Sequence, residues 1–164
     1  MRLDEITVTT IDGRSTSLAE YAGRTRLIVN VASRCGFTSQ YEQLEALQRR
    51  YEARGFTVLG FPSDQFQQEL ESDDAVAEYC STTWGVTFPM FARVAVNGED
   101  RSPVFAELSS APDEAGDAGD VRWNFEKFLV TPDGHVTRFR SSTKPDDPAI
   151  IERIEASVRP DVAA

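Results

Sequence analysis

The two cysteines are the residues of this chain best suited to covalent chemistry, and Cys35 lies in the more favourable setting. It follows a short apolar, β-branched run at residues 27–32, which is typical of a buried strand. After it, Ser39 and Glu42 have the spacing of a capping box at a helix N-terminus. A thiol before such a terminus meets unpaired N–H groups and the positive end of the helix dipole, and Arg34 adds a cation. Because these features favour the thiolate, the sequence predicts that Cys35 is a nucleophile.

The elements that position Cys35 follow an α/β pattern. Strands are predicted at residues 27–32, 56–61, 91–96, 128–130 and 136–139, and helices at residues 40–54, 72–82 and from 146 onward. Ser72 is the expected N-cap of the second helix, and an Asp-Gly turn at residues 12–13 predicts an N-terminal hairpin over residues 6–18. The order of elements indicates a three-layer domain around a mixed central sheet. The 164 residues are expected to form one domain, residues 1–164.

Composition narrows the class of protein. The chain is 40% hydrophobic and 27% charged, which is typical of soluble globular domains. A formal net charge of −10 argues against nucleic acid or an anionic membrane as a partner. The N-terminal residues lack an apolar signal-peptide core, and no stretch approaches the ~18 apolar residues of a membrane span. We therefore expect a cytoplasmic protein without stable membrane association, and two cysteines in a reducing compartment are more often reactive than structural.

Three segments resemble the signatures of the glutathione peroxidase family, whose members have a thioredoxin-like fold. They are residues 30–38 around Cys35, residues 59–66 and residues 123–130, in that order. Residues 85–91 and the Val-Asn-Gly sequence that ends at Gly98 also match, so the similarity covers nearly the whole chain. Long signatures in the right order are far more specific than a single short motif. The resemblance implies the cysteine-containing, thioredoxin-dependent type of this family.

The resemblance also implies roles for particular residues. Cys35 corresponds to the nucleophile that attacks a peroxide, and Trp123, Asn124 and Gln68 correspond to neutral hydrogen-bond donors around its sulfur. The segment after the second signature is one residue shorter than the family pattern and lacks the usual Pro-Gly, so Gln67 stays open as an alternative to Gln68. Neutral donors can stabilise negative charge without neutralising the thiolate. Such a site needs no metal or other cofactor, and its product is a sulfenic acid.

Cys80 is the other cysteine, and the resemblance implies that it resolves the Cys35 sulfenic acid. Family members that use thioredoxin carry their resolving cysteine in the segment that matches Glu78-Tyr79-Cys80, whereas the cysteine of the second signature is Ser63 here. The resulting disulfide would be reduced by thioredoxin, with glutathione as the alternative. A disulfide needs Cα atoms within roughly 7 Å, so the helix that holds Cys80 is expected to loosen on oxidation. The short connection before Trp123 implies a monomer that is open to bulky hydroperoxides.

Other interpretations of these residues remain open. Cys80 and Trp123 are also compatible with ordinary core packing. One histidine and two distant cysteines have no metal-ligand spacing. A competing function is a thiol redox sensor or relay, in which Cys35 passes its disulfide to a client protein. A thioredoxin-type disulfide oxidoreductase is disfavoured, because Thr38 stands where that chemistry needs a second cysteine.

Overall fold

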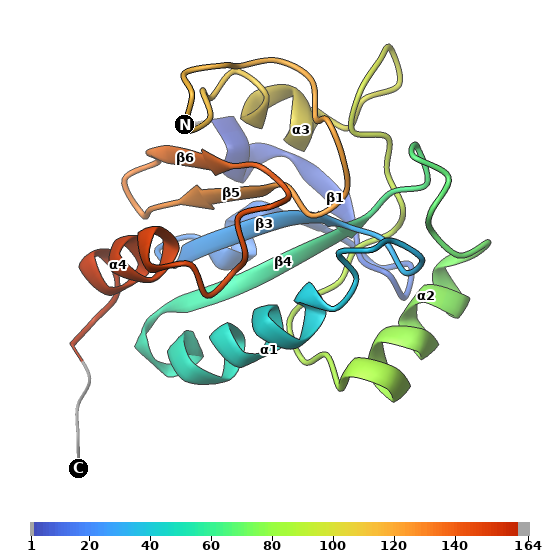
Figure 1. Cartoon of the computed structure of the whole chain (residues 1–164), viewed down its shortest axis with the longest axis horizontal. Coiled ribbons are helices and arrows are strands. Elements are labelled where there is room, and N and C mark those ends of the chain that lie inside the picture. Colours follow the sequence, from blue (N-terminus) through green and yellow to red (C-terminus); the bar gives the residue numbers. More distant parts are fainter. Residues whose placement is uncertain (1, 161–164) are drawn as a thin grey trace.

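Four strands form the central sheet of the computed structural model, which describes residues 2–160 (Figure 1). In the order in which they lie in the sheet, they are β4 (Phe56–Pro62), β3 (Thr25–Val31), β5 (Lys127–Val130) and β6 (Val136–Phe139). β3 is parallel to β4, whereas β5 is antiparallel to both β3 and β6. The predicted mixed sheet is therefore confirmed. The ends of the predicted domain, residues 1 and 161–164, lie outside the described residues.

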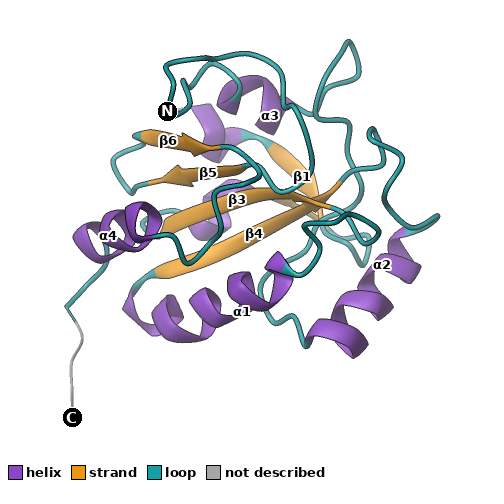
Figure 2. Cartoon of the chain, viewed as in Figure 1, coloured by secondary structure: helices purple, strands orange, loops and turns teal. Residues whose placement is uncertain are grey.

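Helices surround this sheet, as the purple ribbons in Figure 2 show. They are α1 (Gln40–Tyr51), α2 (Asp73–Tyr79), α3 (Pro103–Leu108) and α4 (Pro148–Ser157). Because side chains alternate along a strand, β3 supplies both cores: Val29 belongs to the cluster that contains residues of α1 and α4, and Ile28 to the cluster that contains residues of α3. The three layers follow from this alternation. No helix between residues 2 and 160 is long and apolar enough to cross a bilayer.

The predicted N-terminal hairpin is also present. β1 (Thr7–Thr9) pairs antiparallel with β2 (Ser15–Ser17) around the Asp-Gly turn, in which Gly13 has a left-handed φ of 91°. Val8 of β1 belongs to the same hydrophobic cluster as α3. The hairpin therefore covers part of the sheet face on the α3 side.

The predicted strand at residues 91–96 is wrong. Only isolated bridges occur there. The Arg93 N–H donates to Asp73 Oδ1 and the Val96 N–H donates to Gln65 Oε1, so side chains take the place of a neighbouring strand at these positions. Regular backbone pairing therefore does not continue along the segment. α3 was not predicted from the sequence, although Ser102 followed by Pro103 is a typical helix start, and the Ser102 hydroxyl accepts the Val104 N–H.

Helix starts and ends agree only in part with the predictions. The Ser72 side chain accepts the Ala75 N–H at 3.1 Å, as expected of an N-cap. Ser39, however, makes no capping bond, because its backbone is already helical (φ −59°, ψ −16°) and an N-cap needs an extended backbone. The predicted helix at residues 72–82 is α2 followed by a wider, π-helical turn, Cys80–Trp84. α1 is extended by a 3-10 turn, Glu52–Arg54, which ends at the left-handed Gly55.

The two serines provide a matched pair for testing the caps. We expect Ser72→Ala to lower the free energy of unfolding by about 1 kcal/mol, because it removes the acceptor for the Ala75 N–H. Ser39→Ala removes no capping bond from a serine that is also exposed, so its effect should stay within about 0.5 kcal/mol. Urea denaturation of both variants measures the two values. Equal losses would contradict this assignment of the caps.

Candidate active site

Cys35 lies in the loop between β3 and α1, at the edge toward which the C-terminal ends of β3 and β4 point (Figure 1). Its backbone N–H donates to Thr38 Oγ1 at 2.9 Å, and that hydroxyl donates to Ala32 O at 2.9 Å. The Phe37 N–H donates to Cys35 Sγ at 3.3 Å. The side chain is 9% exposed. The loop thus holds a largely buried sulfur with a backbone donor directed at it, an arrangement that stabilises negative charge on sulfur.

The Cys35 loop is bonded to the segment that carries the predicted glutamine. The Arg34 N–H donates to Gln68 O at 2.8 Å, and the Ser33 N–H donates to Glu69 Oε1 at 3.0 Å. The Arg34 side chain itself is exposed. Burial raises the pKa of the Glu69 carboxyl, and hydrogen bonds from neighbouring groups offset part of this effect. Two backbone N–H groups of the Cys35 loop are therefore fixed by Gln68 and Glu69, which are consecutive in the sequence.

The two candidate glutamines differ in where the structure places them. Gln68 is half-buried, and its Oε1 accepts a hydrogen bond from Asn124 Nδ2 at 3.3 Å. Gln67 is exposed and has a left-handed φ of 59°, and its N–H donates to Asp64 O at 2.8 Å. The structure thus brings Gln68 and Asn124 together, although they are far apart in the sequence. Gln67 lies on the solvent side of the same turn.

Trp123 and Asn124 lie in the turn that leads into β5. Asn124 is fully buried, and its Oδ1 has no hydrogen-bond partner among the described residues. Trp123 is half-buried and packs against the hydrophobic cluster that contains Cys35, and its ring lies 5.2 Å from that of Phe66. Between residues 2 and 160, the hydrogen bond that reaches the Cys35 sulfur comes from the Phe37 N–H, not from these donors. Trp123 thus packs against the same hydrophobic cluster as Cys35, and within the described residues none of the three predicted donors bonds to the Cys35 sulfur.

Cys80 is the first residue of the π-helical turn, and its side chain is 2% exposed. Burial raises the pKa of the Cys80 thiol to about 11; the adjacent Tyr41 hydroxyl lowers it by less, and the charge of Glu69 raises it further. Cys80 and Cys35 are both free thiols and belong to one hydrophobic cluster. The predicted resolving cysteine is therefore packed and protonated in the reduced protein.

Several buried polar residues around the site were missed by the sequence analysis. Asn30 and Lys127 are fully buried, and each lies within an apolar strand, where a polar side chain needs a partner. That requirement was a usable signal for both. Tyr41, which adjoins Cys80, had no signal, because its place in α1 is also that of a core aromatic. Within residues 2–160, no group of three or more His, Cys, Asp or Glu is placed to hold a metal ion.

The burial of Cys80 can be tested by alkylation in the reduced Cys35→Ser variant, which has a single thiol. We expect iodoacetamide to modify Cys80 slowly at pH 7, because the thiolate is the reactive form and the pKa of this thiol is about 11. The rate should rise roughly tenfold per pH unit up to that pKa. Mass spectrometry of quenched samples measures it. A rate that already levels off near pH 9 would show that the thiol is solvated, in contradiction to this packing.

Solved structures share this fold. The crystal structure of Trgpx in apo form superposes with a TM-score of 0.74 and 34% sequence identity, and the match covers 96% of this chain and 98% of that one. A thiol:disulfide interchange protein of the thioredoxin family from Chlorobium tepidum matches with a TM-score of 0.65 at 19% identity, over 93% and 92% of the two chains. The second match establishes the fold alone. The predicted thioredoxin-like architecture is confirmed.

Sequence comparison identifies the family. The family model for glutathione peroxidase matches residues 3–109. Thioredoxin/glutathione peroxidase BtuE of Escherichia coli is 47% identical, over 90% of this chain and 92% of the relative. Hydroperoxy fatty acid reductase gpx1 of Synechocystis is 48% identical, over 84% and 85%. A glutathione peroxidase-like peroxiredoxin of Saccharomyces cerevisiae is 47% identical, over 81% and 82%. With these matches along most of its length, the chain belongs to the glutathione peroxidase family.

Proposed function

We propose that the protein is a thiol-dependent peroxidase in which Cys35 reduces hydrogen peroxide and organic hydroperoxides. The observation that carries this proposal is the setting of Cys35 Sγ, which accepts the Phe37 N–H at 3.3 Å in a loop bonded to the Gln68 segment. The thiolate attacks one peroxide oxygen, the O–O bond breaks, and that oxygen stays on sulfur as a sulfenic acid. The other oxygen leaves as an alkoxide or hydroxide and takes up a proton to become an alcohol or water.

The departing oxygen acquires negative charge in this step, and Trp123, Asn124 and Gln68 are the proposed donors to it. The Asn124 amide donates to Gln68 Oε1, so the Gln68 oxygen is already used and its NH₂ group is oriented to donate. The indole N–H of Trp123 is donor-only. Preorganised neutral donors of this kind lower the barrier where charge develops. Gln68 is assigned in preference to the exposed Gln67 because of its bond to Asn124.

Cys80 is the proposed resolving residue. Its thiolate attacks Cys35 Sγ, the hydroxyl of the sulfenic acid leaves as water after protonation, and a disulfide forms. Because the thiol is buried and its pKa is raised to about 11, this step requires the α2 segment to open and solvate Cys80. The π-helical turn at residues 80–84 is the place where the helix is already irregular. The opened segment must also bring the two Cα atoms within the roughly 7 Å that a disulfide needs.

The reductant that completes the cycle is thioredoxin, with glutathione as the alternative. The Escherichia coli relative is named for both donors, and the Synechocystis relative is named a hydroperoxy fatty acid reductase, which supports apolar hydroperoxides as substrates. Two free thiols suit the reducing cytoplasm, where thioredoxin keeps such cysteines reduced. The acidic chain, with a net charge of −10, acts as a monomeric single domain, residues 1–164, without a nucleic-acid partner.

The test is an NADPH-coupled peroxidase assay on the wild type, Cys35→Ser and Cys80→Ser, run once with thioredoxin and its reductase and once with glutathione and its reductase. We expect thioredoxin-driven turnover that both variants lose. Turnover that survives in Cys80→Ser would mean a one-cysteine mechanism. No turnover with either donor, together with a trapped mixed disulfide on a client protein, would favour the redox relay instead.

A further inference from the structure

We propose that Asn30 and Lys127 are positioning residues for peroxide reduction, which act through the backbone of the turn at residues 123–126. Neither side chain takes part in the chemistry described above, and both are fully buried. The proposal rests on the function given to Trp123 and Asn124, because it concerns how those two donors are held.

Asn30 bonds to three peptide groups of the turn at once. Its Nδ2 donates to Trp123 O at 2.9 Å, and its Oδ1 accepts the Glu126 N–H at 3.1 Å. Its own backbone carbonyl accepts the Phe125 N–H at 2.6 Å. Asn30 lies on β3, the strand that leads directly into the Cys35 loop. One residue of the nucleophile strand therefore fixes the backbone on both sides of Asn124.

The turn needs this support because its conformation is unfavourable. Phe125 has a φ of 63°, in the left-handed region, which is unfavourable for a residue other than glycine. Such a conformation persists only where surrounding bonds hold it. Relaxation of Phe125 toward an ordinary φ would rotate the peptide next to Asn124 and move both donors relative to the sulfur.

Lys127 supports the same turn by bonding to one of its backbone carbonyl groups. Its Nζ donates to Phe125 O at 2.5 Å and to Ser141 O at 3.2 Å. Burial lowers the pKa of Lys127 to about 7, and the charge of the adjacent Glu126 offsets part of that effect. Gln40, the first residue of α1, also donates to Ser141 O, at 2.9 Å. The turn is thereby connected to the helix that follows the nucleophile.

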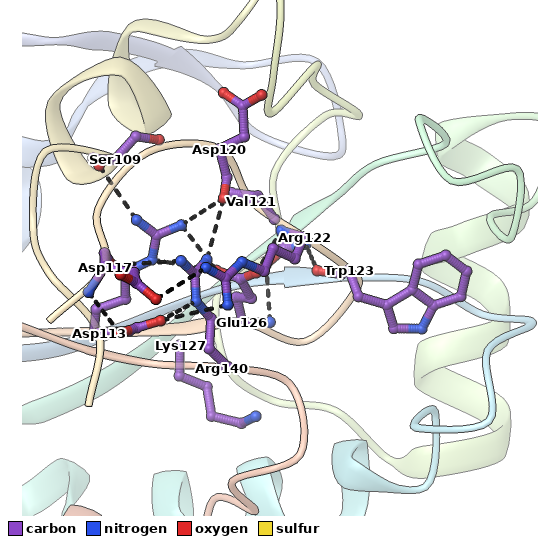
Figure 3. A network of polar contacts seen from close by, with 12 residues as sticks. Ser109, Asp113, Asp117, Asp120, Val121, Arg122, Trp123, Glu126, Lys127 and Arg140 are labelled. Atoms are coloured by element: carbon purple, nitrogen blue, oxygen red, sulfur yellow. Dashed lines mark hydrogen bonds and ion pairs between the residues drawn. The ribbon is translucent and has the colours of Figure 1, made fainter. Parts of the chain in front are cut away.

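An ion-pair network fixes the far end of the turn (Figure 3). The buried Glu126 carboxylate accepts the Arg122 N–H at 2.5 Å, and it pairs with Arg138 at 3.1 Å and Arg140 at 2.8 Å. Figure 3 shows the Trp123 indole directed away from this network. The network holds the end of the turn, but Asn30 is the residue that ties the turn to β3. The distance between the donors and Cys35 therefore depends on Asn30.

A double-mutant cycle tests this inference. The rate constant for oxidation of Cys35 by hydrogen peroxide is measured in single-turnover experiments on folded protein, as the loss of free Cys35 thiol. We expect Asn30→Ala to lower it on the order of tenfold to a hundredfold, the effect of small misplacement of reacting groups. In the Trp123→Phe/Asn124→Ala background, Asn30→Ala should lower the same rate constant by less than about twofold. The reason is that the effects of residues that act through one another do not add.

Gln48→Ala is the matched control. Gln48 is buried, and its Oε1 accepts the Val58 N–H at 2.7 Å, so the variant loses a comparable backbone contact elsewhere in α1 and β4. It should be less stable yet oxidise at the wild-type rate. If Asn30→Ala fails to fold, Lys127→Met takes its place, because it removes the bond to Phe125 O and keeps the apolar stem. Lys127→Met is also expected to slow Cys35 oxidation much less in the Trp123→Phe/Asn124→Ala background than in the wild type.

The outcomes separate the two proposals. If Trp123→Phe and Asn124→Ala slow oxidation but Asn30→Ala and Lys127→Met do not, the positioning inference is overturned and the proposed function stands. Full additivity of Asn30→Ala with the donor variants would also overturn the inference, because it would mean that Asn30 acts by another route. If neither donor variant slows oxidation, the donor assignment itself is wrong, and the positioning inference fails with it.

Discussion

The end of the ladder between β3 and β5 is the constraint on which the site depends. β3 is paired with β4 along its whole length, but its pairing with β5 stops at Val29, opposite Lys127. Beyond that point the Asn30 carbonyl accepts the Phe125 N–H, and the Asn30 side-chain amide binds Trp123 O and the Glu126 N–H. The backbone carbonyl that β3 must satisfy and the side chain of the same residue thus hold the turn that carries Asn124. The place where the β3–β5 pairing ends therefore sets where this turn lies.

The surroundings of Cys35 and of Cys80 differ in how far they are prepared for the reaction. The half around Cys35 is assembled in the reduced protein, with a backbone donor on the sulfur and Gln68 bonded to Asn124. The half around Cys80 is packed, and this burial holds the Cys80 thiol in its neutral form because it raises the pKa of the thiol to about 11. In the proposed cycle, peroxide attack therefore occurs where the site is already assembled, whereas formation of the disulfide requires the segment that holds Cys80 to open. The short α2 and its π-helical turn suit that role, since a short helix has few bonds to break.

Sequence patterns predicted the elements that depend on local rules. The apolar β-branched strands β3 and β4, the Ser72 cap and the Asp-Gly hairpin were all recognisable, because each is decided by neighbouring residues. The strand at residues 91–96 and the Ser39 cap were wrong, because tertiary hydrogen bonds and the tight Cys35 loop decide those backbones. Resemblance is the basis for proposing Cys35 and its donors. Nothing local indicates that Asn30 contacts residues 123–126, because that contact joins segments far apart in the sequence.

Cys35 and Cys80 are proposed to form one redox pair despite the burial of Cys80. The decisive measurement is mass spectrometry of the reduced protein after one equivalent of hydrogen peroxide, under denaturing and non-reducing conditions. We expect a product lighter by the two hydrogens of a new disulfide, with the peptides of Cys35 and Cys80 linked. A product that gains oxygen on Cys35 while Cys80 stays a free thiol would contradict it.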